Sequence, residues 1–137
     1  MRISIDFGIT VTDSLKKSSD GYLEHKMVLS NSEPCEDLVR SIFPEINFNE
    51  DLEHIAVTGG KHGNIGDHIN NTPVFHINEV DAIGEGAMHL SGIEKNKSSI
   101  IVSAGSGTAC IYAKDGKYLH CSGTGVGGGT VLGLSKL

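Results

Sequence analysis

A glycine-rich run near the end of the chain, Gly123–Thr130, is the segment whose residue types best suit the binding of an anion. Glycines let the backbone approach a phosphate without a Cβ in the way, and the N–H groups at a helix start supply donors and partial positive charge. The run leads into a helix-compatible stretch, Val131–Leu137. It therefore predicts a phosphate site, while a flexible linker is the alternative that composition alone allows. The candidate phosphate-binding residues are Gly125, Gly127, Gly128 and Gly129.

Composition favours one acidic domain. The chain has 137 residues, of which 38% are hydrophobic, and a formal net charge of −6. This length is enough for one core and too short for two ordinary domains. Because there is no cluster of Lys and Arg, the acidic balance argues against nucleic acid and against an anionic membrane surface as partners, since both need a basic face. A phosphate site in such a chain must depend on backbone dipoles or on a metal ion.

Cysteine and histidine spacing argues against a disulfide-bonded framework and against a zinc site. Cys35, Cys110 and Cys121 contain no CxxC pair and do not describe a disulfide framework. Among the histidines only His62 and His68 form even a loose pair, which is not the spacing of a zinc site. The N-terminus lacks the apolar region of a signal peptide, and no stretch approaches the roughly 18 apolar residues of a membrane span. We therefore predict a soluble cytoplasmic protein with reduced cysteines.

Hydrophobic periodicity predicts an α/β fold, a mixed sheet flanked by helices. Ile3, Ile5 and Phe7 alternate with polar residues, which is the pattern of a half-buried strand. Strands are expected at 2–7, in the two arms of a hairpin over 9–30, and at 54–58, 74–77, 100–102, 109–112 and 118–121, with 100–102 buried. Helices are expected around 38–42, weakly from Ile65 to Ile69, from the N-cap Asn78 to Gly92, and at the end of the chain.

Five short motifs stand in an order that resembles one enzyme family. They are Asp6–Thr10, Val57–Gly60, Asn78–Ala82, Ala104–Thr108 and Gly123–Thr130. Together they resemble the type II (eukaryotic-like) pantothenate kinases of the acetate kinase/sugar kinase/Hsp70/actin superfamily. The resemblance covers essentially the whole chain, and the ordered set is more specific than any one motif.

The resemblance implies an RNase H-like, actin-like ATPase fold, of which this chain is the N-terminal half. Residues 1–121 would form the N-terminal RNase H-like lobe, and residues 122–137 the start of a truncated second lobe. The final helix is barely two turns long and has no cap, so the second lobe is expected to be interrupted. The adenosine-binding segment and most of that lobe have no counterpart here.

The function implied is ATP-dependent phosphorylation of pantothenate with Mg²⁺, the first step of coenzyme A biosynthesis. Members of the family bind ATP and substrate in the cleft between two lobes, so this half alone is expected to be inactive. Two other hypotheses stay open. One is a non-catalytic lobe that binds nucleotide weakly or acts as an interaction module, and the other is a kinase of the same fold with a different hydroxyl-bearing acceptor, such as a sugar. The protein partners expected are a second copy of the chain or a missing C-terminal half.

The resemblance assigns the first phosphate turn to Asp6, Gly8 and Thr10. Phosphoryl transfer needs a carboxylate for Mg²⁺, turns that approach phosphate closely and a base near the acceptor hydroxyl. Asp6 would orient Mg²⁺ or its water shell, and Gly8 and Thr10 would supply backbone or hydroxyl donors. A strand-end aspartate that caps a turn is the structural alternative.

The second phosphate turn would consist of Gly105, Ser106, Gly107 and Thr108. Ser106 matches a family position at which a hydroxyl reaches the acceptor substrate, while the second such hydroxyl is replaced by Ala109. Gly105, Gly107 and Thr108 would contact the nucleotide. An ordinary hairpin turn without a ligand is the alternative.

The family's general base is a glutamate, and an ungapped count from Thr58-Gly59-Gly60 places Asp67 at its position. Aspartate can serve as a base but is one methylene shorter, so the acceptor oxygen must come closer or a water must bridge. A solvated carboxylate without a catalytic role is the alternative for Asp67.

Three further positions depart from the family pattern. Ile9 stands in place of the second glycine of the first phosphate turn, and Asp13 stands in place of a lysine. His120 replaces the arginine that grips the pantothenate carboxylate, so a single pH-dependent donor would replace a bidentate fork. The departures at Asp13 and His120 favour the non-catalytic lobe or an acceptor other than pantothenate.

Overall fold

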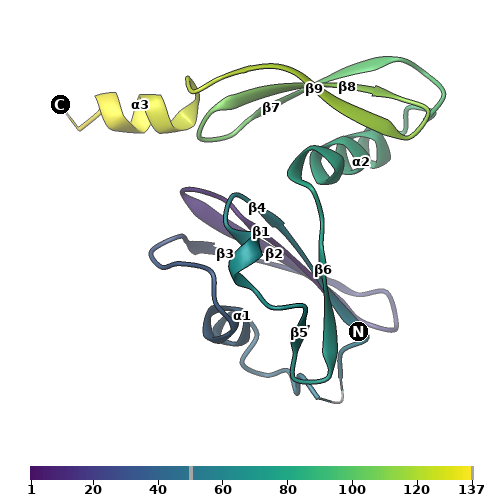
Figure 1. Cartoon of the computed structure of the whole chain (residues 1–137), viewed down its shortest axis with the longest axis vertical. Helices are drawn as coiled ribbons and strands as arrows, with labels where there is room; N and C mark the ends of the chain where they lie inside the picture. Colours follow the sequence, from purple (N-terminus) through teal and green to yellow (C-terminus); the bar gives the residue numbers. More distant parts are fainter. Residues whose placement is uncertain (50, 137) are drawn as a thin grey trace. The chain divides into compact units, whose positions relative to one another are not determined.

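The computed structural model describes residues 1–49 and 51–136, and its contacts divide the chain into two compact units, Met1–Ile77 and Asn78–Leu137 (Figure 1). The predicted lobe boundary after residue 121 falls inside the second unit, within the strand Lys117–Thr124. Compact units and evolutionary lobes need not share a boundary, so the lobe assignment stays a prediction.

The first unit contains a six-stranded mixed sheet. Its order is β3-β2-β1-β4-β6-β5, in which β1, β4 and β6 are parallel and the other neighbours are antiparallel. The strands are β1 (Arg2–Phe7), β2 (Val11–Lys17), β3 (Leu23–Leu29), β4 (His54–Gly59), β5 (His68–Ile69) and β6 (Thr72–His76). The predicted strand at the N-terminus, the hairpin after it and the strand before Gly59 are confirmed.

One face of this sheet packs on the helix α1 (Glu36–Ile42) and the segment that follows it. The alternation predicted for β1 is observed, since Ile3, Ile5 and Phe7 are all buried. They form a core with residues of α1, of the loop after it and of the neighbouring strands, including Val39, Ile42, Phe43, Phe48, Ile55, Val57, Ile69 and Val74. Burial of apolar area on this face holds the parallel strands together.

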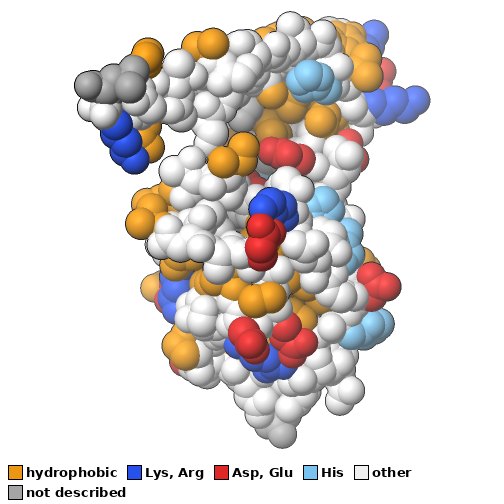
Figure 2. Space-filling view, turned by 60° about the vertical axis from the view of Figure 1, so that its left-hand side comes forward, with side chains coloured by type: hydrophobic (Ala, Val, Ile, Leu, Met, Phe, Trp, Pro, Cys, Tyr) orange, Lys and Arg blue, Asp and Glu red, His pale blue; other side chains and the backbone are white. Residues whose placement is uncertain are grey.

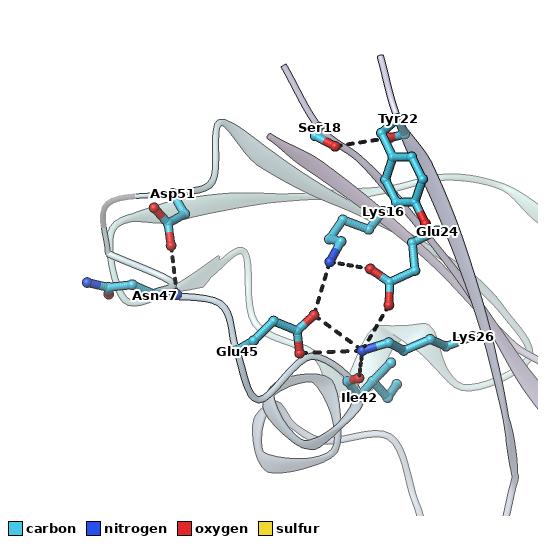
Figure 3. A network of polar contacts seen from close by, with 9 residues as sticks. All are labelled: Lys16, Ser18, Tyr22, Glu24, Lys26, Ile42, Glu45, Asn47 and Asp51. Atoms are coloured by element: carbon cyan, nitrogen blue, oxygen red, sulfur yellow. Dashed lines mark hydrogen bonds and ion pairs between the residues drawn. The ribbon is translucent and has the colours of Figure 1, made fainter. Parts of the chain in front are cut away.

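A network of charged side chains ties the β2–β3 hairpin to the segment after α1 (Figure 3). Lys16 and Lys26 each pair with both Glu24 and Glu45, and the Lys26 ammonium also donates to the Ile42 carbonyl at 3.1 Å. The Glu45 side chain accepts from its own backbone amide and from both lysines, which lowers its pKa to about 2. The network closes over the edge of the core because the Lys26 ammonium lies 4.5 Å from the centroid of the Phe43 ring.

The weak helix predicted from Ile65 to Ile69 is wrong. A single 3₁₀ turn at His62–Asn64 comes first, and residues 68–69 then form the short strand β5, which pairs with β6. Glycine at position 66 disfavours a helix, and Asn70 takes the left-handed conformation that a tight reversal requires. Ile69 is buried as a strand residue. The spacing of Ile65 and Ile69 therefore reflects burial and not a helix.

The second unit is a helix packed on a three-stranded antiparallel sheet. Its elements are α2 (Glu79–Ser91), β7 (Ser99–Ala104), β8 (Thr108–Lys114), β9 (Lys117–Thr124) and α3 (Gly128–Leu134). The caps predicted for α2 are confirmed, because Asn78 accepts from the Val80 amide and Gly92 is left-handed with φ +66°. The helix lies close to β9, where the Tyr118 ring occupies the space above Gly84.

The described residues form two sheets, the six-stranded mixed sheet of the first unit and the three-stranded antiparallel sheet of the second. The second unit corrects one other expectation. The strand predicted to be buried is not, since Ile100 and Val102 are each 62% exposed. The final helix begins at Gly128, within the glycine run that was predicted to supply the helix start. Leu137, the last residue of the predicted helix, lies outside the described residues.

The surface shows mixed charges. In the view of Figure 2, Lys and Arg side chains lie singly or beside Asp and Glu side chains. Within residues 1–49 and 51–136, no helix has both the length and the apolar character needed to cross a bilayer.

Candidate functional site

The carboxyl ends of three parallel strands meet at one edge of the six-stranded sheet. Asp6 of β1 is in register with Thr58 of β4, and Phe7 is in register with Gly59. On the other side of β4, Val57 is in register with His76 of β6. In open α/β sheets ligands bind outside the carboxyl ends of the strands, so this edge is where chemistry is expected.

Gly59 lies directly against the predicted magnesium ligand. A Cβ built on Gly59 would lie 2.7 Å from Asp6 Oδ1 and 2.5 Å from the Phe7 carbonyl oxygen, and its φ is +93°. Both the space and the backbone conformation therefore require glycine here. The motif Val57–Gly60 carries no predicted role for Gly59. In the structure Gly59 makes room for the Asp6 carboxylate.

Thr58 was not identified from the sequence as a site residue. Among the buried side-chain polar atoms of the described residues, its hydroxyl oxygen is the one without a hydrogen-bond partner. A buried hydroxyl without a partner is costly, which favours a water or ligand at this edge, beside Asp6. The feature of the sequence that could have identified Thr58 is its place directly before Gly59 and Gly60.

The first phosphate turn is tight and is tied to the end of β3. The Ser30 hydroxyl donates to the Gly8 carbonyl at 2.8 Å, and the Ser30 amide donates to the Thr10 carbonyl at 3.0 Å. A Cβ on Gly8 would lie 2.5 Å from the Val11 carbonyl oxygen, so this turn also needs glycine. Ile9, the departure from the family pattern, is 84% exposed at its tip.

Asp13, which replaces the family's lysine, faces the site with a negative charge. It is the register partner of Asp6 across the antiparallel β1–β2 pair. Its carboxylate accepts from His25 Nε2 at 2.8 Å. Directly opposed carboxylates repel each other, so a cation at this edge would relieve that repulsion.

These residues fit a magnesium ion bound mainly through phosphates. No three His, Cys, Asp or Glu residues are grouped to hold a metal within residues 1–49 and 51–136. Mg²⁺ is commonly held by one or two carboxylates, substrate phosphates and several waters, and the Asp6 carboxylate with the unpaired Thr58 hydroxyl beside it could supply the protein's share of such a site.

Asp67, the predicted base, lies in the loop before β5 and not in a helix. Its side chain is 88% exposed. Its backbone carbonyl accepts from the Val74 amide of β6 at 2.8 Å, which fixes its Cα beside that strand. Its Oδ1 lies 3.6 Å from Nε2 of His76, which was not predicted from the sequence as a site residue.

A second histidine connects this aspartate with the glycine beside Asp6. The His62 ring lies 5.4 Å from the His76 ring, measured between centroids, and His62 Nδ1 donates to the Gly59 carbonyl at 2.6 Å. The loose pair of His62 and His68 noted in the sequence is replaced by a pair of His62 and His76. In the first unit, Asp6 and Asp67 are thus connected through Gly59, His62 and His76.

In the second unit, the two remaining glycine motifs lie directly against each other. The amides of Gly128 and Gly129 donate to the carbonyls of Gly105 and Ser106, at 2.8 and 3.1 Å. A Cβ on Gly127 would lie 2.8 Å from backbone atoms of Gly107. The run is therefore fixed against the β7–β8 turn, which is not how a flexible linker behaves.

These same bonds occupy two of the donors predicted for phosphate. The amide of Gly127 also has a partner, the Thr130 hydroxyl at 3.3 Å, and the Thr108 hydroxyl donates to the Val126 carbonyl at 2.9 Å. An anion at the start of α3 would have to replace the bonds from Gly128 and Gly129. Gly125, in contrast, has open space where a Cβ would stand.

The predicted acceptor residues occupy the same unit. His120 is exposed in β9, in register with Ile111, and a Cβ on Gly123 would lie 3.1 Å from its Nε2. Ala109 is in register with Gly123, so the position that carries a second hydroxyl in the family faces bare backbone.

Sequence comparison finds relatives that match nearly all of the chain. No family model matches it. A protein of Bacillus cereus named type II pantothenate kinase is 32% identical over 98% of this chain and 48% of its own length. Another of the same name, from Staphylococcus epidermidis, is 27% identical over 100% of this chain and 49% of its own length. The chain thus spans about half the length of the curated relatives it matches.

Structure comparison shows the fold. A ROK family glucokinase from Streptomyces griseus, in complex with glucose and AMPPNP, matches with a TM-score of 0.62 and 13% identity over 89% of this chain and 47% of its own. The ethanolamine utilization protein EutJ from Carboxydothermus hydrogenoformans matches with a TM-score of 0.56 and 15% identity over 98% and 56%. The predicted α/β, actin-like fold is confirmed.

Proposed function

We propose that this chain, which resembles the N-terminal half of the type II pantothenate kinases, is the part of an ATP-dependent kinase that holds the base and the phosphate turns, with pantothenate as the acceptor. The observation that supports it most is the series of contacts that leads from the predicted base Asp67 through His76 and His62 to Gly59, the glycine that lies against the Asp6 carboxylate. Catalysis would require the half of the relatives' length that has no counterpart here.

In this proposal each group has one task. Mg²⁺, held by Asp6 and the ATP phosphates, would neutralise charge on the phosphates. Asp67 takes the proton from a primary hydroxyl of the acceptor as that oxygen forms a bond to the γ-phosphorus. The bond from the γ-phosphorus to the bridging oxygen breaks and ADP leaves with the electron pair. Positioning and electrostatics supply most of the rate enhancement in such a transfer.

The two glycine turns of the second unit would hold the phosphates of ATP. Gly105, Gly107, Thr108 and the run Gly125–Gly129 offer backbone close enough for an anion, once the amides of Gly128 and Gly129 leave their carbonyl partners. Ser106 and His120 would contact the acceptor. The imidazole of His120 would give the pantothenate carboxylate one donor, where an arginine gives two.

Two observations keep a non-catalytic lobe as the second candidate. Asp13 places a carboxylate bound to His25 where the family has a cation, and the amides of Gly128 and Gly129 are already engaged. A sugar acceptor is a third candidate, because His120 weakens carboxylate recognition and one structural neighbour was solved with glucose.

The experiment that tests the proposal uses the intact chain joined to the second half of the Bacillus cereus relative. ATP consumption is measured with pantothenate and, separately, with hexosamines. We expect turnover with pantothenate that falls about 100-fold or more in Asp67→Asn, since general-base catalysis contributes roughly that much. The exposed helix residue Asp37, as Asp37→Asn, is the matched control and should keep the wild-type rate. Turnover on hexosamines alone would reject pantothenate as the acceptor.

A further inference from the structure

His76 stands beside the proposed base without having been predicted to do so. Its Nε2 is 3.6 Å from Asp67 Oδ1, and its side chain is 27% exposed while that of Asp67 is 88% exposed. A strand residue whose side chain is largely covered therefore lies next to an almost fully exposed loop carboxylate. Of the two, His76 is the one whose position the fold determines.

β4 and His62 hold His76 in place from two sides. The amide of Ile77, the next residue, donates to the Val57 carbonyl of β4 at 2.8 Å, which continues the parallel pairing one residue past the end of β6. On the ring side, His62 lies 5.4 Å away between centroids. His62 is itself held because its Nδ1 donates to the Gly59 carbonyl. His76 thus has little freedom to move relative to β4.

Within residues 1–49 and 51–136, no other side chain orients the Asp67 carboxylate. Its backbone carbonyl accepts from the Val74 amide. An exposed aspartate side chain otherwise samples several rotamers, and a carboxylate one methylene shorter than the family's glutamate tolerates less error in its placement. A general base must lie within about 3 Å of the hydroxyl whose proton it takes.

We propose that His76 is a positioning residue for Asp67 in the reaction proposed above, on which this inference rests. At 3.6 Å the two side chains are in ion-pair contact, and a small rotation of the exposed Asp67 side chain would let the Nε2–H of His76 donate to Oδ1 and turn Oδ2 toward the acceptor hydroxyl. His62, bound to Gly59, holds the His76 ring in place. One end of this arrangement lies beside Asp6, so the base is set in a fixed relation to the magnesium carboxylate.

The contact itself can be tested on the chain without any enzymatic assay. Long-range ¹H–¹⁵N spectra of the histidine rings report which nitrogen carries the proton and how each ring responds to a neighbour. We expect His76 to carry the proton on Nε2, and Asp67→Asn to shift its ring nitrogens while those of His54 stay unchanged. His54 is the matched control because it lies in the same sheet, beside Phe75. Unchanged His76 signals in Asp67→Asn would overturn the proposed contact.

The positioning role is tested on the chain joined to the second half of the Bacillus cereus relative. His76→Phe keeps a ring against His62 but removes the donor, and His76→Gln restores an N–H of similar reach. We expect His76→Phe to lower kcat about 10- to 100-fold, as misplaced catalytic groups do, with KM for ATP and pantothenate within about twofold. His76→Gln should recover most of the loss.

The matched control here is His68→Gln, which removes an exposed histidine next to Asp67 along the chain. It should keep the wild-type kcat. If the joined wild-type protein is active, two results would overturn the positioning role alone: a His76→Phe variant that keeps the wild-type kcat, or a His68→Gln variant whose kcat falls as much as that of His76→Phe. A joined wild-type protein without turnover would reject the proposed function, and this role with it, whatever the ring spectra show.

Discussion

Gly127 and Gly107 are so close that a Cβ built on Gly127 would lie 2.8 Å from the Cα, the carbonyl carbon and the oxygen of Gly107. The φ of Gly127 is −172°, which any residue can adopt, so space and not backbone strain requires glycine here. This close approach lets the amides of Gly128 and Gly129 reach the carbonyls of Gly105 and Ser106. Two motifs some twenty residues apart thereby form one structure.

Gly127→Ala is expected to separate the two turns. The added methyl group must displace the backbone of Gly107, and such overpacking costs about 1–3 kcal/mol. Urea denaturation should show the loss, and hydrogen exchange should show faster exchange of the Gly128 and Gly129 amides. Gly125→Ala is the control, because nothing lies within 4 Å of its Cβ position. Equal stability of the two variants would contradict the contact.

Gly59→Ala is expected to destabilise the protein more than Gly60→Ala. Its φ of +93° disfavours any side chain, and its Cβ would meet Asp6 Oδ1 and the Phe7 carbonyl. We expect a loss of about 1–3 kcal/mol in the free energy of unfolding. Gly60→Ala, whose Cβ position is open, should stay within about 0.5 kcal/mol of wild type. A Gly59→Ala variant as stable as Gly60→Ala would show that the carboxyl edge is looser than described.

Glu45→Gln tests the charged network on the hairpin. The hydrogen bond from its own amide and those from Lys16 and Lys26 lower the pKa of Glu45 to about 2, below the ordinary glutamate value of 4.5. A carboxyl with a lowered pKa in the folded state stabilises the fold above its unfolded pKa, and this contribution is lost as the pH falls toward the folded value.

We therefore expect Glu45→Gln to be less stable than wild type at pH 7, by up to about 1 kcal/mol for such an exposed group. The difference should shrink as the pH falls from 4.5 to about 2. Urea denaturation at several pH values measures this, with Asp37→Asn as an exposed control outside the network. A difference that stays constant over that range would mean that the charge of Glu45 is not what stabilises the hairpin.

Local patterns predicted much of the fold. The alternation of Ile3, Ile5 and Phe7 placed β1 correctly because every second side chain of a strand faces the same side. Asn78 and Gly92 delimited α2 because capping depends on the residue type at the helix ends. Such features need no information about distant residues.

Tertiary pairing decided what local patterns could not. Ile65 and Ile69 have helical spacing, yet the pairing of β5 with β6 made the second a strand residue. Ile100 and Val102 are apolar but face outward, because only one side of the three-stranded sheet packs on α2. The same holds for the site. His76 at the end of β6 meets Asp67 in the loop before β5, and the carbonyls of Gly105 and Ser106 meet the amides of Gly128 and Gly129, contacts that no spacing in the sequence indicates.

The most direct test of the central claim is isothermal titration calorimetry of ATP into this chain, and into the chain joined to the second half of the Bacillus cereus relative, with and without Mg²⁺. The account predicts binding that depends on Mg²⁺ and is weakened at least about tenfold in Asp6→Asn, since one charged contact to the bound ion contributes roughly 1.5–3 kcal/mol. Absence of ATP binding by both proteins, or binding that is indifferent to Mg²⁺ and to Asp6→Asn, would contradict it.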